Sequence, residues 1–204
     1  MNLRNTKICI VLILFIVAIV SCIDPIYPEN QYLQHLGTLF LSFILLWDIQ
    51  KMKLSLFAYL FVAIFIIIHI IGARWIYSFV PYNELFDTYL GFDLNQLFEN
   101  ERNHYDRFVH LSFGVLFIPF LFEKFNAIFK NHLMSILLAW LAVQTFSLLY
   151  EVFEWLLTVF MDPQIAEDYN GQQGDIFDAQ KDMALALLGS SIASLFYLIK
   201  RINK

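Results

Sequence analysis

Charged residues are scarce in this sequence. Lys, Arg, Asp and Glu make up only 15% of its 204 residues, whereas about 25% is usual in soluble domains. Hydrophobic residues reach 59%, with 22 Phe among them, and the mean hydropathy is +0.63. This composition excludes an ordinary soluble domain, and the length fits one membrane bundle. We therefore expect residues 1–204 to form a single integral membrane helical domain in a lipid bilayer.

Cysteine and the familiar catalytic motifs are missing or nearly so. Cys9 and Cys22 both lie in the first hydrophobic stretch and offer neither a metal-binding spacing nor a disulfide framework. The sequence has no GxSxG motif, no phosphate-binding loop, no HExxH motif and no pair of ExxH motifs. It shows no inverted repeats typical of transporters. Because the net charge is −5, no nucleic-acid partner is expected.

Six hydrophobic segments are candidates for membrane-spanning helices. They cover about residues 8–23, 33–47, 54–72, 108–122, 133–160 and 183–199. A spanning helix needs roughly 17–25 apolar residues, so the second and fourth segments depend on their flanking residues. The sequence thus predicts an all-α fold, a polytopic membrane protein with a bundle of six transmembrane helices.

The basic residues divide unevenly between the two sides of these segments. Nine of the 13 fall on one side: Arg4, Lys7, Lys51, Lys53, Lys124, Lys130, Lys200, Arg201 and Lys204. Because connections rich in Lys and Arg stay in the cytoplasm, both termini are predicted to be cytoplasmic. Of the 18 acidic residues, only Asp48 and Glu123 lie on that side. We expect a multi-pass protein of the bacterial cytoplasmic (inner) membrane with an acidic outer face.

The first segment allows a second interpretation. The basic start MNLRNTK, the apolar run and residues 19–22 (IVSC) also resemble a lipoprotein signal, in which Cys22 would be lipidated after cleavage. A first transmembrane helix is the preferred interpretation. Both leave the remaining topology unchanged.

The longest connection, residues 73–103, is rich in aromatic side chains and contains Pro81 and Gly91. Trp and Tyr at this density are typical of the membrane–water interface. We expect an outer loop with one short amphipathic helix, near residues 83–90 or 93–100, lying over the outer mouth of the bundle.

Ionisable side chains lie in or at the edge of the apolar segments, near the predicted outer face. They are Asp106, His110, Glu151, Glu154, Asp178 and Asp182. An ionisable group at membrane depth costs roughly 2.5 kcal/mol or more unless it has a partner, a proton or a water-filled cavity. We therefore predict that segments four, five and six bring these groups together in one buried polar site.

Segment four offers a pair of candidate ligands. Asp106 and His110 are four residues apart and share one helix face, so the carboxylate can orient the imidazole or join it on a metal. Capping of the helix start is the alternative for this pair. Arg102 and Arg107 are candidates for clamping a carboxylate or phosphate of a substrate. His69 of segment three either joins the site or hydrogen-bonds a neighbouring helix.

Segments five and six supply carboxylates. Glu151 and Glu154 are three residues apart and would repel each other at membrane depth unless a metal ion, an Arg or a shared proton lies between them. The alternative is one protonated Glu hydrogen-bonded to a neighbouring helix. In segment six, Asp178 and Asp182 follow the candidate N-cap Asp175, and acidic residues are also ordinary at a helix N-terminus.

Three functional hypotheses stay open. The leading one is an enzyme that acts on an amphipathic, lipid-linked or envelope-derived substrate with a divalent metal that activates water. The second is a protein whose carboxylates hold a cation or relay protons, and the third is a polar core that only orders the bundle. The predicted catalytic residues are Glu151, Glu154, His110 and Asp178, the predicted substrate-binding residues are Arg102, Arg107, Tyr105 and Tyr150, and the hypothetical metal ligands are Asp106, His110, Glu151, Glu154, Asp175, Asp178 and Asp182.

Five motifs carry a family resemblance: SCIDP (21–25), HIIGARWIYSFVP (69–81), RNHYDRFVH (102–110), YEVFEW (150–155) and QGDIFDAQKDM (173–183). In these motifs the chain resembles the YjdF-type bacterial inner-membrane proteins, a family of uncharacterised function. Gly72 and Tyr77 match the family pattern, whereas Trp75 and Ile76 depart from it. The resemblance implies a polytopic membrane protein and no established activity.

A looser similarity of arrangement links the chain to VanZ-like proteins. In those proteins an Asp-Arg/Lys-x-x-His helix start, a later acidic helix and an Asp-x-x-Asp helix start recur. The corresponding residues here are Asp106, Arg107, His110, Glu151, Asp175 and Asp178.

Overall fold

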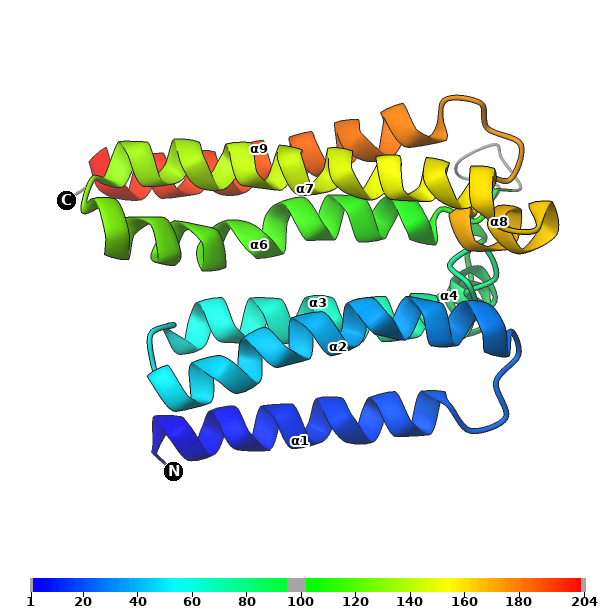
Figure 1. The fold of residues 1–204 in the computed structure, drawn as a ribbon, viewed down its shortest axis with the longest axis horizontal. Coiled ribbons are helices and arrows are strands. Elements are labelled where there is room, and N and C mark those ends of the chain that lie inside the picture. Colours follow the sequence, from blue (N-terminus) through cyan, green and yellow to red (C-terminus); the bar gives the residue numbers. More distant parts are fainter. Residues whose placement is uncertain (1, 95–101, 203–204) are drawn as a thin grey trace.

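The computed structural model describes residues 2–94 and 102–202, and within these ranges it contains helices and no strand (Figure 1). Six helices are long and apolar enough to cross a membrane: α1 (Leu3–Ser21), α2 (Pro28–Lys51), α3 (Leu56–Arg74), α6 (Tyr105–Phe129), α7 (His132–Phe160) and α9 (Asp178–Ile202). Among the described residues the short helices α4 (Tyr82–Leu90) and α8 (Pro163–Asn170) both lie at one end of the bundle. The predicted all-α fold with six spanning helices is confirmed.

Several spanning helices extend beyond the apolar segments predicted for them. α2 begins at Pro28 rather than near residue 33, and α6 ends at Phe129 rather than near residue 122. The added turns contain polar residues, which the headgroup region accepts, so hydropathy alone places the helix ends too far inside. Pro28 suits a first helical turn because the N–H that it lacks would have no partner there.

The long helices form two groups of three (Figure 1). α1, α2 and α3 pack against one another, and α6, α7 and α9 form the second group. Packing of α3 against α6 joins the two groups. The N- and C-termini lie at one end of the bundle, and α4 and α8 lie at the other.

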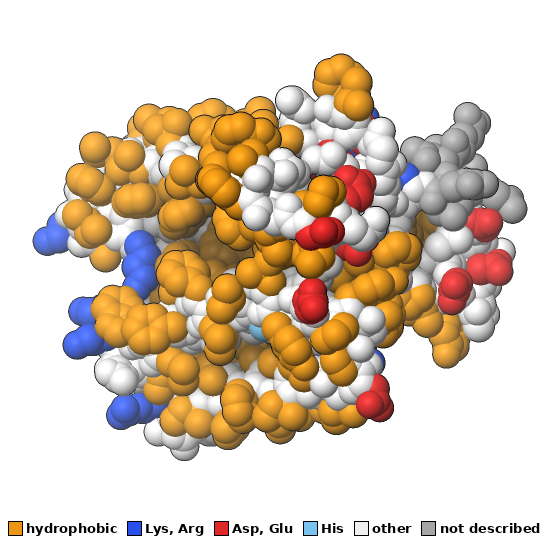
Figure 2. Space-filling view, turned by 45° about the vertical axis from the view of Figure 1, so that its right-hand side comes forward, with side chains coloured by type: hydrophobic (Ala, Val, Ile, Leu, Met, Phe, Trp, Pro, Cys, Tyr) orange, Lys and Arg blue, Asp and Glu red, His pale blue; other side chains and the backbone are white. Residues whose placement is uncertain are grey.

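Charge is sorted along the bundle. Figure 2 shows Lys and Arg at one end of the visible face and Asp and Glu at the other, with hydrophobic side chains between them. In this apolar middle, side chains such as Leu39 and Phe43 are 67% and 66% exposed. Exposed apolar surface on this scale marks contact with lipid, so the protein is embedded in a bilayer.

A buried ion pair fastens α1 to the turn between α2 and α3. Lys7 and Asp48 are both 0% exposed, and Lys7 Nζ donates to Asp48 Oδ2 and to the carbonyl oxygen of Leu54 at 2.7 Å each. The other carboxylate oxygen of Asp48 accepts from the backbone N–H groups of Lys53 and Leu54 at 3.0 Å each. Because both charges have partners, α1 is a packed part of the bundle.

The sequence predicts one of the two short helices, α4, but not the other, α8. α4 covers the first of the two ranges expected for an amphipathic helix, and it ends at Gly91, whose φ of +72° suits glycine. The other expected range, 93–100, lies largely outside the described residues. α8 was not predicted, although Asp162 caps its N-terminus and Pro163 is its first residue. That Asp-Pro start is a helix signal that hydropathy does not show.

Candidate functional site

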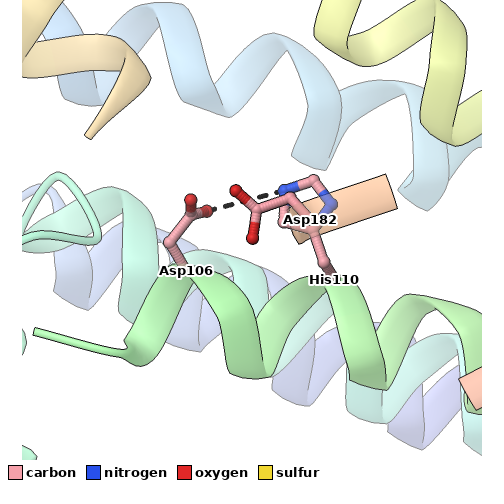
Figure 3. A group of neighbouring side chains, drawn as sticks. All are labelled: Asp106, His110 and Asp182. Carbon is pink, nitrogen blue, oxygen red and sulfur yellow. Dashed lines mark ion pairs between the residues drawn. The ribbon is translucent and has the colours of Figure 1, made fainter. Parts of the chain in front are cut away.

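Three buried side chains from two helices form the centre of the candidate site (Figure 3). Asp106 and His110 come from α6 and Asp182 comes from α9, and their exposed fractions are 8%, 7% and 2%. One ligand atom from each residue lies within 4.8 Å of the others. We call these three residues the Asp106–His110–Asp182 group.

A close contact between α6 and α9 positions this group. A Cβ atom at Gly114 would lie 2.4 Å from the carbonyl oxygen of Ala186, and one at Gly189 would lie 2.4 Å from a backbone carbonyl of α6. The two backbones therefore touch, as small residues permit between membrane helices. Gly114 lies one turn after His110, and Ala186 lies one turn after Asp182. The contact thus sets the distance between imidazole and carboxylate.

His110 lies between two carboxylates without a hydrogen bond to either. Its Nε2 is 3.7 Å from Asp106 Oδ1, and its Nδ1 is 3.7 Å from Oε1 of Glu151 on α7. Both distances exceed the roughly 2.7–3.2 Å of an N–H···O hydrogen bond. Glu151 Oε1 and Asp182 Oδ1 are buried and have no hydrogen-bond partner within the described part of the chain. Buried oxygens normally have one, and a bound ion or water would supply it.

The donor set fits a divalent cation. Bonds from such an ion to a histidine nitrogen or a carboxylate oxygen are about 2.0–2.2 Å long, so two of its ligands lie roughly 3–4 Å apart. The 3.7 Å separation of His110 Nε2 from Asp106 Oδ1 falls in this range. Glu151 lies beside the other ring nitrogen, Nδ1, where it can orient the imidazole. Ligand atoms of the Asp106–His110–Asp182 group lie within 4.8 Å of one another, so only a small side-chain movement would bring all three to bonding distance of one ion. Imidazole and carboxylate together suit Zn²⁺, Mn²⁺ or Fe²⁺.

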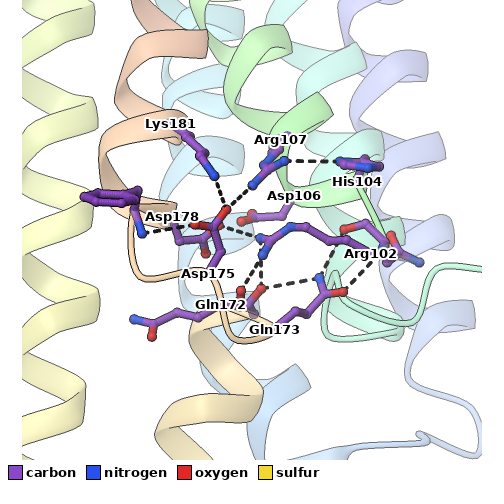
Figure 4. A network of polar contacts seen from close by, with 12 residues as sticks. Arg102, His104, Asp106, Arg107, Gln172, Gln173, Asp175, Asp178 and Lys181 are labelled. Carbon is purple, nitrogen blue, oxygen red and sulfur yellow. Dashed lines mark hydrogen bonds and ion pairs between the residues drawn. The ribbon is translucent and has the colours of Figure 1, made fainter. Parts of the chain in front are cut away.

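Polar contacts fasten the start of α6 to the loop before α9 (Figure 4). Arg102 is 8% exposed and its Nη2 lies 2.5 Å from Asp178 Oδ1. The same guanidinium donates to the backbone carbonyls of Gly171 and Gln172. Arg102, predicted to bind substrate, therefore has protein partners, and Asp178, a predicted ligand, is one of them.

Asp175 takes part in a second set of these contacts. Its Oδ2 accepts from Arg107 Nη2 and from Lys181 Nζ at 2.5 Å each, and its Oδ1 accepts from the backbone N–H of Phe177 at 3.1 Å. The hydrogen bonds from Lys181 and Phe177, with the nearby Arg107 charge, lower the pKa of Asp175 from 3.8 to about 2. The structure does not bring Asp175 into the Asp106–His110–Asp182 group.

The remaining predicted residues lie close to the group. Glu154 is partly buried and follows Glu151 by three residues on α7, and its backbone carbonyl accepts from Asn170 Nδ2 at 3.1 Å. The Tyr150 and His110 rings have centroids 6.0 Å apart. Tyr105 donates its hydroxyl proton to a backbone carbonyl of α3 at 2.8 Å, which gives it a role in packing.

A cavity of about 470 Å³ opens beside the group, between α2, α3, α6 and α7. Its lining is hydrophobic except for His69, Tyr77, Asp106, His110, Ser147 and Tyr150. Ligand sites commonly measure roughly 300–1,000 Å³. The sequence did not predict this cavity, because a Phe that lines a cavity and a Phe that faces lipid look alike in a hydropathy pattern.

His69 makes the contacts of a packing residue. Its Nε2 lies 3.0 Å from the carbonyl oxygen of Gln34, and its Nδ1 is hydrogen-bonded to the Tyr77 hydroxyl. Because a carbonyl only accepts, Nε2 carries the proton and Nδ1 accepts from Tyr77. A Cβ atom at Gly72 would lie 2.7 Å from the Tyr77 ring, so glycine is needed for this contact. Of the two interpretations of His69, the geometry supports the hydrogen bond to a neighbouring helix.

Comparisons with known proteins agree with this architecture. The family described as "Predicted membrane protein (DUF2238)" matches residues 6–203. The chain belongs to this family. Inner membrane protein YjdF of Escherichia coli (strain K12) is 28% identical over 157 residues, which cover 75% of this chain and 70% of YjdF. No solved structure matches.

Membership of the DUF2238 family confirms the resemblance to YjdF-type proteins and agrees with a multi-pass protein of the bacterial inner membrane. Neither description names a substrate or a reaction. The chemistry of this DUF2238 protein therefore has to be argued from the geometry of the site.

Proposed function

We propose that this DUF2238 protein binds a divalent cation through Asp106, His110 and Asp182 and is an enzyme that uses the cation to activate water against an amphipathic substrate. The observation that carries the proposal is the pair of buried oxygens without hydrogen-bond partners, Glu151 Oε1 and Asp182 Oδ1, near His110. The adjacent apolar cavity supports the amphipathic character of the substrate.

The charge balance also favours a cation. Asp106, Glu151 and Asp182 are each less than 9% exposed, and buried carboxylates close together repel one another. The two nearby arginines are already paired with other carboxylates. A divalent cation would offset the negative charge of the carboxylates that these arginines do not pair with.

The geometry suggests a role for each neighbouring side chain. A bound divalent cation lowers the pKa of a coordinated water molecule toward neutrality. Glu151 Oε1 lies 3.7 Å from His110 Nδ1, on the other side of the ring from Asp106, so it would accept the Nδ1–H proton and orient an imidazole that binds the cation through Nε2. Glu154 lies three residues after Glu151 on the same face of α7 and would add a second, partly buried carboxyl group beside it. Asp178 is bonded to Arg102, so we assign it to positioning.

Transport of a cation or proton is supported less well. A path across the membrane needs polar groups in the other half of the bundle. Below the Asp106–His110–Asp182 group, the cavity is lined by apolar side chains such as Phe117, Phe120 and Leu121.

Metal analysis of the detergent-purified protein tests the proposal. We expect the wild-type protein to hold a stoichiometric ion after dialysis against Zn²⁺ or Mn²⁺ and removal of excess metal. His110→Gln and Asp182→Asn should each weaken metal binding by about 10-fold or more, because even second-shell substitutions cost 10–100-fold. Glu167→Gln serves as the control, since Glu167 is exposed and outside the group.

Thermal unfolding of the same samples separates binding from folding. Added metal should raise the melting temperature of the wild type and of Glu167→Gln, since a ligand of the folded state stabilises it. The same metal should leave the melting temperatures of folded His110→Gln and Asp182→Asn unchanged. A wild-type protein that takes up no divalent ion, or variants that bind it as tightly, would contradict the proposed function.

A further inference from the structure

We propose that the cavity between α2, α3, α6 and α7 holds one hydrocarbon chain of a membrane phospholipid, which enters sideways from the bilayer with its phosphate head at the Asp106–His110 end. The inference rests on the proposed function, because it names the substrate class of the same site. It depends on the shape, polarity and opening of the cavity.

Polarity changes along the cavity. On α6, the polar Asp106 and His110 come first, and the lining continues with Phe113, Phe117 and Leu121. The facing helices contribute further hydrophobic side chains at this deeper level. A wholly polar ligand would leave these walls uncovered, whereas a lipid puts its chain against them and its head beside the carboxylates and the imidazole.

The depth of the cavity suits an acyl chain. Leu121 lies fifteen positions after Asp106, which corresponds to about 22 Å along a helix. One leaflet contributes only about half of the roughly 30 Å hydrocarbon core of a bilayer. A phospholipid chain can therefore lie along the cavity while its head stays at the level of Asp106.

The cavity opens to lipid on its side. Phe40 of α2 and Phe146 of α7 line it and are 64% and 52% exposed. Figure 2 shows the surface hollowed between the two groups of helices, with hydrophobic side chains at the rim. A molecule that already lies in the bilayer can reach this opening without crossing water.

Head and chain would be bound by different means. A bound cation can coordinate a phosphate oxygen, whereas Asp106, Asp182 and Glu151 without a cation would repel the phosphate. Binding of the hydrocarbon chain needs only the apolar walls. Chain binding and metal binding can therefore fail separately in an experiment.

Photolabelling in nanodiscs tests the inference. The nanodiscs contain phosphatidylethanolamine and phosphatidylglycerol with a phosphatidylglycerol probe that carries a diazirine at the end of one acyl chain. After irradiation, peptide mass spectrometry locates the adducts. We expect adducts at Phe117 and Phe120 in the wild type, because these lining residues lie about 16–21 Å along α6 from Asp106, where the chain ends. The adducts should be strongly reduced in Leu41→Trp, which fills the cavity. Leu39→Trp, on the lipid-facing side of the same helix, should keep them.

Further arms make each outcome informative. Ile44→Phe, at another lining position of α2, replaces Leu41→Trp if that variant fails to insert. His110→Gln should lose metal and with it part of the phospholipid adducts, but it should keep the adducts of a diacylglycerol probe, which has no phosphate for the carboxylates to repel. Failure of the metal site is therefore seen separately from failure of the chain site. Adducts confined to lipid-facing positions such as Leu39 would overturn the inference. The inference would also be overturned if, with metal present, a diacylglycerol probe without phosphate labelled the cavity as strongly as the phospholipid probe does.

Discussion

At the scale of single residues, the acidic side chains at the start of α9 have different environments. Asp175 and Asp178 each lie 2.5 Å from an arginine nitrogen, whereas Asp182 has a buried oxygen without a hydrogen-bond partner. The arginines, Arg102 and Arg107, lie 76 and 68 positions earlier in the chain. The spacing of the aspartates could not show which of them these arginines would reach.

The pH dependence of stability should reveal the Asp175 contacts. The pKa of Asp175 is lowered from 3.8 to about 2 in the folded protein, chiefly by the hydrogen bond from Lys181. Between these values the unfolded chain binds more protons than the folded one, so Asp175 stabilises the fold above about pH 4. This contribution is lost as the pH falls through about 2.

Thermal unfolding of wild type and Asp175→Asn from pH 6 to pH 2.5 measures this effect. We expect the variant to melt at a lower temperature at pH 6 and the difference to shrink below about pH 4. Asp87→Asn, at an exposed position of α4, is the control and should show no such trend. A difference that stays constant down to pH 2.5 would argue against the ionised contact.

At the scale of helices, the sequence predicts which residues share a face of one helix, but it does not predict which helices pack against each other. Asp106 and His110 share a face because residues four apart always do so on a helix, and the structure places them together. The contact at Gly114 and Gly189 depends on which helices pack side by side. Neither hydropathy nor motif spacing shows which helices pack side by side. The sequence therefore predicts that Asp182 lies near His110 but not the helix contact that brings them together, and it does not predict the cavity.

The first helix gives a prediction at this scale. Lys7→Met should destabilise the protein by about 3–5 kcal/mol, because it leaves Asp48 buried without its cation. Adding Asp48→Asn to Lys7→Met should restore part of the loss. Arg4→Met is the control, since Arg4 is exposed on the same helix. Chemical or thermal unfolding in detergent measures the series.

The same contact bears on the lipoprotein interpretation of the first segment. Cleavage before Cys22 would remove Lys7, and the carbonyl oxygen of Ser21 that accepts from Arg74 would be lost as well. We therefore expect the intact mass of the purified protein to include residues 2–21. A mass that begins at a lipidated Cys22 would contradict this expectation.

At the scale of the whole molecule, the direction of insertion decides which side of the membrane the site faces. The structure places both termini at one end of the bundle and the Asp and Glu side chains of the visible face toward the other. The sequence assigns nine of the 13 basic residues to the side of the membrane that holds the termini. From the positive-inside rule we therefore expect that end in the cytoplasm and the Asp106–His110–Asp182 group near the outer face.

Reporter fusions test this orientation. Fusions after Lys53, Lys130 and Lys204 should report the cytoplasm, and fusions near Glu84 and Gln172 should report the outside, because the helix connections alternate between the two faces. An outside signal at Lys130 with a cytoplasmic signal at Gln172 would reverse the bundle. The group would then face the cytoplasm, and the phospholipid would have to enter the cavity from the inner leaflet.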